Sequence, residues 1–232
     1  MQTIGLIGGM SWESTAEYYR IINERVKERL GGLHSARIVL YSVDFAEIEE
    51  LQQQGDWSQA TALMVDAARR VKAGRGDFVV ICTNTMHRMA GEIEQQTGMP
   101  VLHIADPTAH AVAAAGVGVV GLLGTRYTME QDFYRGRLEA LHGLRVVVPE
   151  AEDRGFVHDV IYGELCLGVT RDESKQRYLE IIEGLIGRGA GGVILGCTEI
   201  GLLIGPDDTE ALLFDTTRIH AGAAADRAID GR

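Results

Sequence analysis

Short apolar runs alternate along this chain with longer segments in which apolar residues recur every three or four positions. Short runs predict buried strands, and the longer periodic segments predict helices. In Ser14–Leu30 the apolar residues fall on one helical face, and Ser14 with Glu17 predicts a capping box. The strands expected from apolar runs are Thr3–Ile7, Arg37–Val43, Phe78–Ile81, Val101–Ile104, Gly118–Leu123, Leu144–Val148 and Gly192–Leu195. The expected helices are Ser14–Leu30, Trp57–Lys72, Thr85–Gln96, Met129–Leu141, Arg154–Leu167, Glu173–Gly187 and Thr216–Ala228. Strands separated by helices predict an α/β fold with parallel sheets.

Two landmarks of the chain occur twice, in the same order and at nearly the same spacing. The segment Gly5–Gly8 recurs as Gly121–Gly124, and Phe78–Thr83 recurs as Val193–Thr198. Repetition of this kind indicates a duplicated architecture. We therefore expect two tandem Rossmann-like halves related by a pseudo-two-fold axis, with the active site in the cleft between them. The first half is expected to comprise residues 1–106 plus 214–232, and the second residues 107–213.

Each repeat places a Cys-Thr pair directly after an apolar strand and just before a helix. These cysteines are Cys82 and Cys197. Ligands of open parallel sheets bind beyond the carboxyl ends of the strands, and a helix N-terminus there is expected to lower the pKa of a thiol. If the halves pack face to face, the two thiols meet across one ligand. Such a pair suits inversion of a stereocentre, which needs a base on one face of a carbon and an acid on the other.

Polar groups that could hold a substrate surround the two cysteines. Hydroxyl, amide and backbone donors could stabilise the carbanion through its carboxylate, whereas Glu199 is suited to hold an ammonium group. The donor residues are Thr83, Asn84 and Thr85 in the first half and Thr198 in the second. Cys166 has no counterpart in the repeat, and we expect it to be structural.

Composition excludes several other classes of protein. Against 22 Lys and Arg residues stand 33 Asp and Glu residues, a net charge of −11, which argues against binding nucleic acid or anionic membranes. No apolar run is long enough to span a bilayer. Three cysteines make no disulfide framework, and the histidines lack metal-ligand spacing, so a cytoplasmic protein without a metal is expected. The GxGxxG pattern of Gly116–Gly121 lies at the start of and within a strand, which argues against a nucleotide site.

Four segments together resemble the aspartate/glutamate racemase family. They are Ile4–Thr15, Cys82–His87, Leu123–Tyr134 and Gly196–Ile200. The similarity is closest to the broad-specificity amino-acid racemases. It implies a racemase that needs no pyridoxal phosphate or other cofactor and that forms a homodimer.

The resemblance also implies roles for single residues. It makes Cys197 the base toward the L-enantiomer and Cys82 the base toward the D-enantiomer. By the same resemblance, the residues that bind the substrate carboxylate are Thr83, Asn84, Thr85 and Thr198. The residues that line the pocket are Met10 and Gln52.

Aspartate-specific relatives tend to carry a lysine in the segment that matches Glu164–Gly168, and this chain has none there. Burying a second carboxylate without that cation would be costly, so a broad range that includes neutral amino acids is expected. An aspartate- or glutamate-specific racemase stays an alternative. So do an enzyme similar to maleate isomerases or arylmalonate decarboxylases and a non-catalytic amino-acid-binding protein.

Overall fold

The computed structural model describes residues 1–231, and its contacts divide the chain into two compact units. The first unit is Met1–His103 together with the segment from His220 to the C-terminus, and the second is Ile104–Ile219. The boundary on the C-terminal side falls inside helix α11 (Thr216–Asp230). These limits lie near the expected ones, and the division into two domains of common origin stays a prediction.

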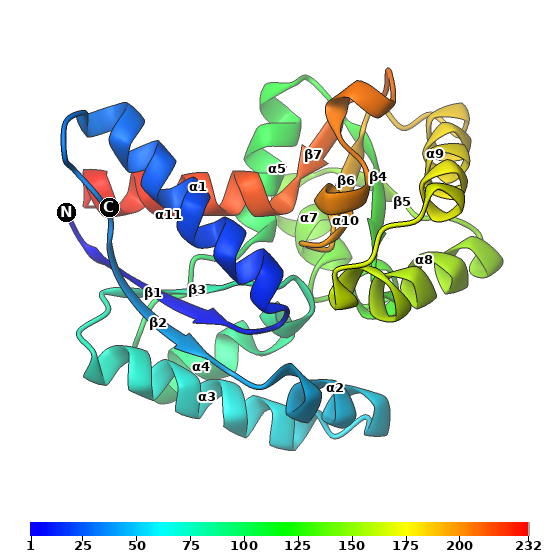
Figure 1. The fold of residues 1–232 in the computed structure, drawn as a ribbon. Coiled ribbons are helices and arrows are strands. Elements are labelled where there is room, and N and C mark those ends of the chain that lie inside the picture. The colour runs from blue at the N-terminus through cyan, green and yellow to red at the C-terminus, as the bar shows by residue number, and fades with distance from the viewer. Residues whose placement is uncertain (232) are drawn as a thin grey trace. The chain divides into compact units, whose positions relative to one another are not determined.

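The first unit is built on a parallel sheet of three strands, in the order β2-β1-β3. Its strands are β1 (Thr3–Gly8), β2 (Arg37–Ser42) and β3 (Phe78–Ile81). Its helices are α1 (Trp12–Leu30), α2 (Phe45–Gln54), α3 (Trp57–Ala73), the 3-10 helix η1 (Thr85–Met89), α4 (Ala90–Thr97) and the greater part of α11. One buried cluster joins the sheet to α1 and α11, and another joins it to α2, α3 and α4, so helices cover both faces (Figure 1).

The second unit contains a parallel sheet of four strands, in the order β5-β4-β6-β7. Its strands are β4 (Val119–Gly124), β5 (Arg145–Val147), β6 (Val193–Gly196) and β7 (Leu213–Asp215). Its helices are α5 (Ala105–Ala114), α6 (Arg126–Glu130), α7 (Arg135–His142), α8 (Ala151–Gly163), η2 (Leu165–Leu167), α9 (Asp172–Gly187), α10 (Ile200–Leu203) and η3 (Pro206–Asp208). Both sheets place a central strand, β1 or β4, beside the strand that leads to a cysteine.

The expected α/β architecture with parallel sheets is confirmed, and several local predictions are wrong. The cap of α1 is Ser11, whose Oγ accepts a hydrogen bond from the Ser14 backbone at 3.3 Å, so Ser14 lies inside the helix. Val101 forms only an isolated bridge with Val79, because the chain turns away after one pairing. The expected helix Met129–Leu141 is two helices, α6 and α7, separated by a break. Helices α2 and α5 and strand β7 were not predicted.

Within residues 1–231, no helix combines the length and the apolar character needed to cross a bilayer.

Candidate active site

The first cysteine lies at the carboxyl end of β3, beside the central strand β1. Ile7 pairs with Ile81, and the Cys82 backbone N–H donates to the Ile7 carbonyl at 2.9 Å. The thiol is fully buried, and its nearest recorded acceptor is the Val80 carbonyl, 4.0 Å from Sγ. Burial alone raises the pKa of Cys82, because a thiolate there loses its hydration.

A histidine side chain contacts the backbone of the segment that follows Cys82. The Nδ1 atom of His87 lies 2.8 Å from the Thr83 carbonyl. A carbonyl oxygen can only accept, so Nδ1 carries the proton. Asn84 and Thr85, the next two residues, are buried at 2% and 4% exposure, and Thr83 is half-buried. The predicted donor residues therefore form one ordered turn next to the thiol.

Met10 and Gln52 belong to the same unit as Cys82. Both side chains are buried, and Met10 directly follows the Gly8-Gly9 end of β1. The amide nitrogen of Gln52, on α2, lies 3.2 Å from the sulfur of Met86 in η1. Gln52 is thus packed against the 3-10 helix that follows the cysteine motif.

The tight turn after β1 depends on glycine. Gly9 has a φ of +92°, and a Cβ atom there would lie 2.2 Å from the Val43 carbonyl. Only glycine combines this conformation with so close an approach. The turn brings Met10 and the start of α1 to the same sheet edge as Cys82.

The second cysteine follows β6 in the corresponding position. Gly124 of β4 pairs with Gly196, and a Cβ on Gly196 would lie 2.7 Å from the Leu123 carbonyl, so the two strand ends approach closely. Cys197 is 8% exposed, and its Sγ donates to Oε2 of Glu199 at 2.9 Å. The hydroxyl of Thr198 donates to the same oxygen, also at 2.9 Å.

Both thiol pKa values are raised, so the expected lowering by a helix N-terminus is wrong for this structure. For Cys197 burial is the largest cause, followed by the negative charges of Glu199 and Cys166. Removing a thiol from water takes away the hydration that stabilises the thiolate, which raises its pKa. Each thiol is therefore predominantly protonated near neutral pH.

Glu199 contacts the groups beside it, and its expected role toward the substrate ammonium stays a prediction. Its carboxylate accepts from the Cys197 thiol and the Thr198 hydroxyl, so in this structure it is a partner of the catalytic candidate itself. The residue is 2% exposed. Its position allows it to orient the Cys197 thiol through this hydrogen bond, a contact that adjacency in the sequence did not predict.

Two threonines at the start of α11 complete the second site, and the sequence analysis missed them. Thr216 donates to the Leu195 carbonyl at 2.8 Å, and Thr217 donates to the Thr198 carbonyl at 3.4 Å. Asp215 caps this helix through the backbone N–H groups of Thr217 and Arg218. The signal for these contacts is the Asp-Thr-Thr sequence at a strand-to-helix junction.

The central strand in each unit ends in the same kind of cap. Ser11 accepts from the Ser14 backbone N–H, and Thr125 accepts from the Thr128 backbone N–H, each at 3.3 Å. These caps follow β1 and β4, the strands beside Cys82 and Cys197. The strand next to each cysteine strand therefore ends in the same backbone arrangement, a helix capped by a hydroxyl side chain.

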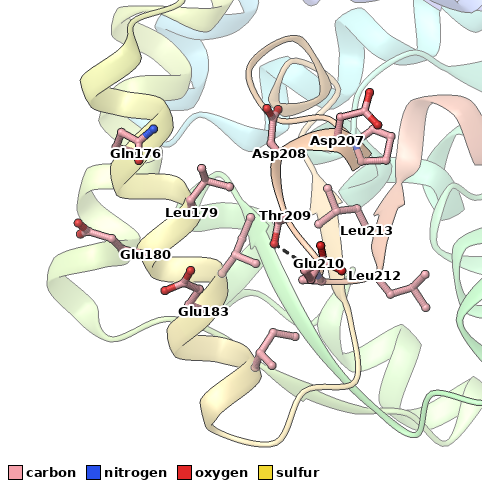
Figure 2. Close-up of a pocket in the computed structure, with 14 residues that line it drawn as sticks. Gln176, Leu179, Glu180, Glu183, Asp207, Asp208, Thr209, Glu210, Leu212 and Leu213 are labelled. Carbon is pink, nitrogen blue, oxygen red and sulfur yellow. Dashed lines mark hydrogen bonds between the residues drawn. The ribbon is translucent and has the colours of Figure 1, made fainter.

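The hollow in Figure 2 is separate from these motifs. It has a volume of about 1140 Å³ and is formed by α9 and residues 206–213 (Figure 2). Its lining includes Glu180, Glu183, Asp207 and Glu210, and none of the lining residues belongs to either cysteine motif. Within residues 1–231, no cluster of three or more His, Cys, Asp or Glu side chains is arranged to hold a metal ion.

Comparison with known proteins identifies relatives over the whole chain and over part of it. A structure from Yersinia pestis, provisionally assigned as an Asp/Glu racemase, is 54% identical with a TM-score of 0.91, covering 99% of this chain and 100% of that one. An aspartate racemase homologue from Pyrococcus horikoshii is 31% identical with a TM-score of 0.84 over the same shares. A glutamate racemase from Streptococcus agalactiae is 32% identical over 128 residues, which are 54% of this chain and 46% of the relative. The alignments thus span about half the length of the curated relatives. The family model for Asp/Glu/hydantoin racemases matches residues 7–224, and the chain belongs to that family.

Proposed function

We propose that the protein is an amino-acid racemase that inverts Cα with Cys82 and Cys197 as the two acid–base groups. The observation that carries this proposal is the matching position of the two thiols. Each is buried, follows the strand next to the central strand of its sheet, and is followed by threonine. Membership of a racemase family supports an isomerase activity for such a pair.

The proton transfers balance without a further reactant. The thiolate of one cysteine takes the α-proton, and the electron pair of the C–H bond stays on carbon as a carbanion conjugated with the carboxylate. The thiol of the other cysteine gives its proton to the opposite face of that carbon. One turnover leaves the first cysteine protonated and the second ionised, so the reverse reaction uses the same groups in exchanged roles.

The raised thiol pKa values suit so weak a carbon acid. A base becomes stronger as the pKa of its conjugate acid rises, which helps proton abstraction, although a smaller fraction is ionised at neutral pH. The Glu199 carboxylate accepts the hydrogen bond of the Cys197 thiol, so it orients the S–H group and keeps it protonated as the acid of the pair. The chemistry requires no cofactor.

The substrate carboxylate is assigned to donors beside the thiols. Asn84 and Thr85 follow Cys82 in an ordered turn, and Thr83 and Thr198 each directly follow a cysteine. Met10 and Gln52 are assigned to the wall of the first unit's site because they lie at the same edge and against η1. Hydrogen bonds to the carboxylate stabilise the carbanion more than the ground state, since charge develops there.

The charges around Cys197 favour a substrate with a neutral side chain. The Glu199 carboxylate raises the pKa of Cys197, and Glu164 contributes to the raised pKa of the buried Tyr178 nearby. The cation of this segment, Arg171, already lies 3.7 Å from Glu164. A second substrate carboxylate would meet negative charge here, so we propose a broad range that includes neutral amino acids.

Racemisation of aspartate or glutamate is the second candidate. The names of the relatives at 31–32% identity favour it. Purified protein would be incubated without pyridoxal phosphate with L-methionine, L-homoserine, L-aspartate and L-glutamate, and loss of optical activity followed by circular dichroism. We expect the neutral substrates to racemise. A strong preference for aspartate would overturn the broad specificity alone, and no racemisation of any of them would overturn the proposed function.

We further propose a cytoplasmic homodimer. Leu33 and Leu40 are exposed on the first unit, and burial of such apolar groups favours association. Sedimentation of the purified protein should give twice the mass of the 25.2 kDa chain, and a monomer at micromolar concentration would overturn the dimer.

A further inference from the structure

The carbonyl group of the residue that follows each cysteine accepts a hydrogen bond from a side chain. In the first unit the donor is His87 Nδ1, 2.8 Å from the Thr83 carbonyl. In the second it is the Thr217 hydroxyl, 3.4 Å from the Thr198 carbonyl. The donors differ in chemistry and come from different elements, but they hold equivalent peptide groups.

Holding the carbonyl fixes the direction of the neighbouring amide. A trans peptide is planar, so its N–H points opposite to its C=O. The Asn84 N–H therefore points away from His87, and the Glu199 N–H points away from Thr217. Oriented amides of this kind are effective donors to a carboxylate on which negative charge develops.

We propose that His87 is a positioning residue, which aims the Asn84 amide at the substrate carboxylate. The Glu199 amide, whose peptide group Thr217 holds, instead donates to the sulfur of Cys197. This inference rests on the proposed racemase function for its ligand. The orientation of the two peptides is set by the protein's own contacts and can be measured without turnover.

The stronger support is in the first unit, where His87 is packed among other rings. Its ring centroid lies 4.8 Å from that of His103 and 5.5 Å from that of His220. His220 is itself fixed, because its Nε2 donates to the Leu102 carbonyl and its Nδ1 accepts from the Tyr18 hydroxyl, each at 2.8 Å. We call His87, His103, His220 and Tyr18 the ring cluster. It leaves His87 little freedom to release the Thr83 carbonyl.

The titratable rings that pack against His87 are His103 and His220. The bond to Thr83 requires a proton on Nδ1, which in a neutral imidazole is the less common tautomer of free histidine. The structure thus assigns a tautomer that is measurable by itself. In the second unit the hydrogen bond from the Thr217 hydroxyl is longer. We therefore expect it to fix the orientation of the Thr198–Glu199 peptide group less firmly.

The variants His87→Leu and His87→Asn form a matched pair. Both remove the ring, but asparagine keeps an N–H donor near the position of Nδ1. We expect His87→Leu to lower kcat by about 30-fold or more, because misaligning one carbanion-stabilising donor costs on the order of 10²-fold. KM should change little, and His87→Asn should recover most of the loss. Thr217→Val should lower kcat by only about 3-fold, with Thr217→Ser close to wild type, since a neutral hydrogen bond contributes little and this one is long.

The control is His142→Leu, which removes a bond of similar kind to Asp106 in the second unit. Melting temperatures of all variants would separate loss of stability from loss of kcat. If His87→Asn is impaired as much as His87→Leu, or if His142→Leu reduces kcat equally, the positioning role is wrong.

Long-range ¹H–¹⁵N correlation spectra of wild-type protein would report the His87 tautomer directly. The Nδ1–H form, with an Asn84 amide resonance that moves on addition of L-methionine or L-aspartate in wild type but not in His87→Leu, supports the proposal. A neutral His87 that is protonated on Nε2 alone, and so cannot donate to the Thr83 carbonyl, overturns it. Absence of racemisation in wild type would remove the proposed function, while the tautomer would still decide whether His87 holds the Thr83 peptide.

Discussion

The two cysteine sites share a backbone plan and differ in their electrostatics. Cys82 lies in an uncharged environment, next to a turn that is anchored by the rings around His87, and burial alone raises its pKa. Cys197 contacts the Glu199 carboxylate, and negative charge adds to the effect of burial. The two units therefore agree more closely in the position of the thiol than in its surroundings. A pair of bases with unequal environments can still act on one substrate, because each step needs only one acid and one base.

Removal of either thiol is expected to have the largest effect. Cys82→Ser and Cys197→Ser should each reduce racemisation by about 10³-fold, since a serine hydroxyl replaces neither the base nor the acid and such groups contribute on the order of 10²–10⁴. Chiral chromatography of the product would measure the rate of racemisation of each variant. Cys166→Ser is the control and should retain activity within about three-fold. Loss in only one of the two catalytic variants would break the equivalence of the sites.

Glu199→Gln tests the difference between the sites and should lower kcat by about 10-fold, because it replaces the charged acceptor of the Cys197 thiol hydrogen bond with a neutral one. The same change removes a negative charge that raises the pKa of Cys197. Alkylation of Cys197 by iodoacetamide, followed by mass spectrometry against pH, should therefore shift to lower pH. The profile of Cys82 should not move. Equal shifts at both thiols would mean that the fold itself had changed.

Stability above neutral pH reports the buried thiols directly. The folded-state pKa of Cys82 is raised above its ordinary value of 9.0, so the folded protein binds this proton more tightly than the unfolded chain does. The contribution is complete below pH 9 and is lost as the pH rises toward the folded-state pKa. One unit above the ordinary value the loss is about 1.4 kcal/mol per thiol. Urea unfolding of Cys82→Ala across this range should show a shallower decline than wild type, and parallel curves would argue against a buried thiol.

Tyr18→Phe should have the smallest effect among these changes. It removes the donor to His220 Nδ1 and should cost about 1–2 kcal/mol of unfolding free energy, with a few-fold decrease in kcat. The matched variant Tyr178→Phe removes a buried bond to the Val157 carbonyl in the second unit. Imidazole resonances of His87 should shift in Tyr18→Phe and stay in place in Tyr178→Phe. A shift in both would show that the ring cluster is not specific to the Cys82 site.

The sequence predicted most of the strands and the places of the two cysteines, because apolar runs and a repeated motif carry that information locally. The cap of α1 was misplaced by three residues, since Ser11 and Ser14 are equally good capping residues and only the turn at Gly9 selects between them. β7 has only three residues, too few to show a period.

The hydrogen bond from Thr217 to Thr198 and the packing of His220 against His87 join residues that are distant along the chain, so no local pattern predicts them. The sign of the thiol pKa shifts was wrong for the same reason, because burial is a property of the folded unit. The local sequence pattern predicted a helix N-terminus near each cysteine. It did not predict that the fold would bury both thiols away from water.

The most direct test of the two-thiol account is the isotope content of the first product formed in D₂O. Each pure enantiomer of a substrate would be converted to a small extent, and the opposite enantiomer isolated and examined by mass spectrometry for deuterium at Cα. Two separate bases predict that essentially every product molecule carries solvent deuterium, from either starting enantiomer, because the abstracted proton stays on the first thiol. Product that retains the original proton would show that a single group moves it from one face to the other, and would contradict the account.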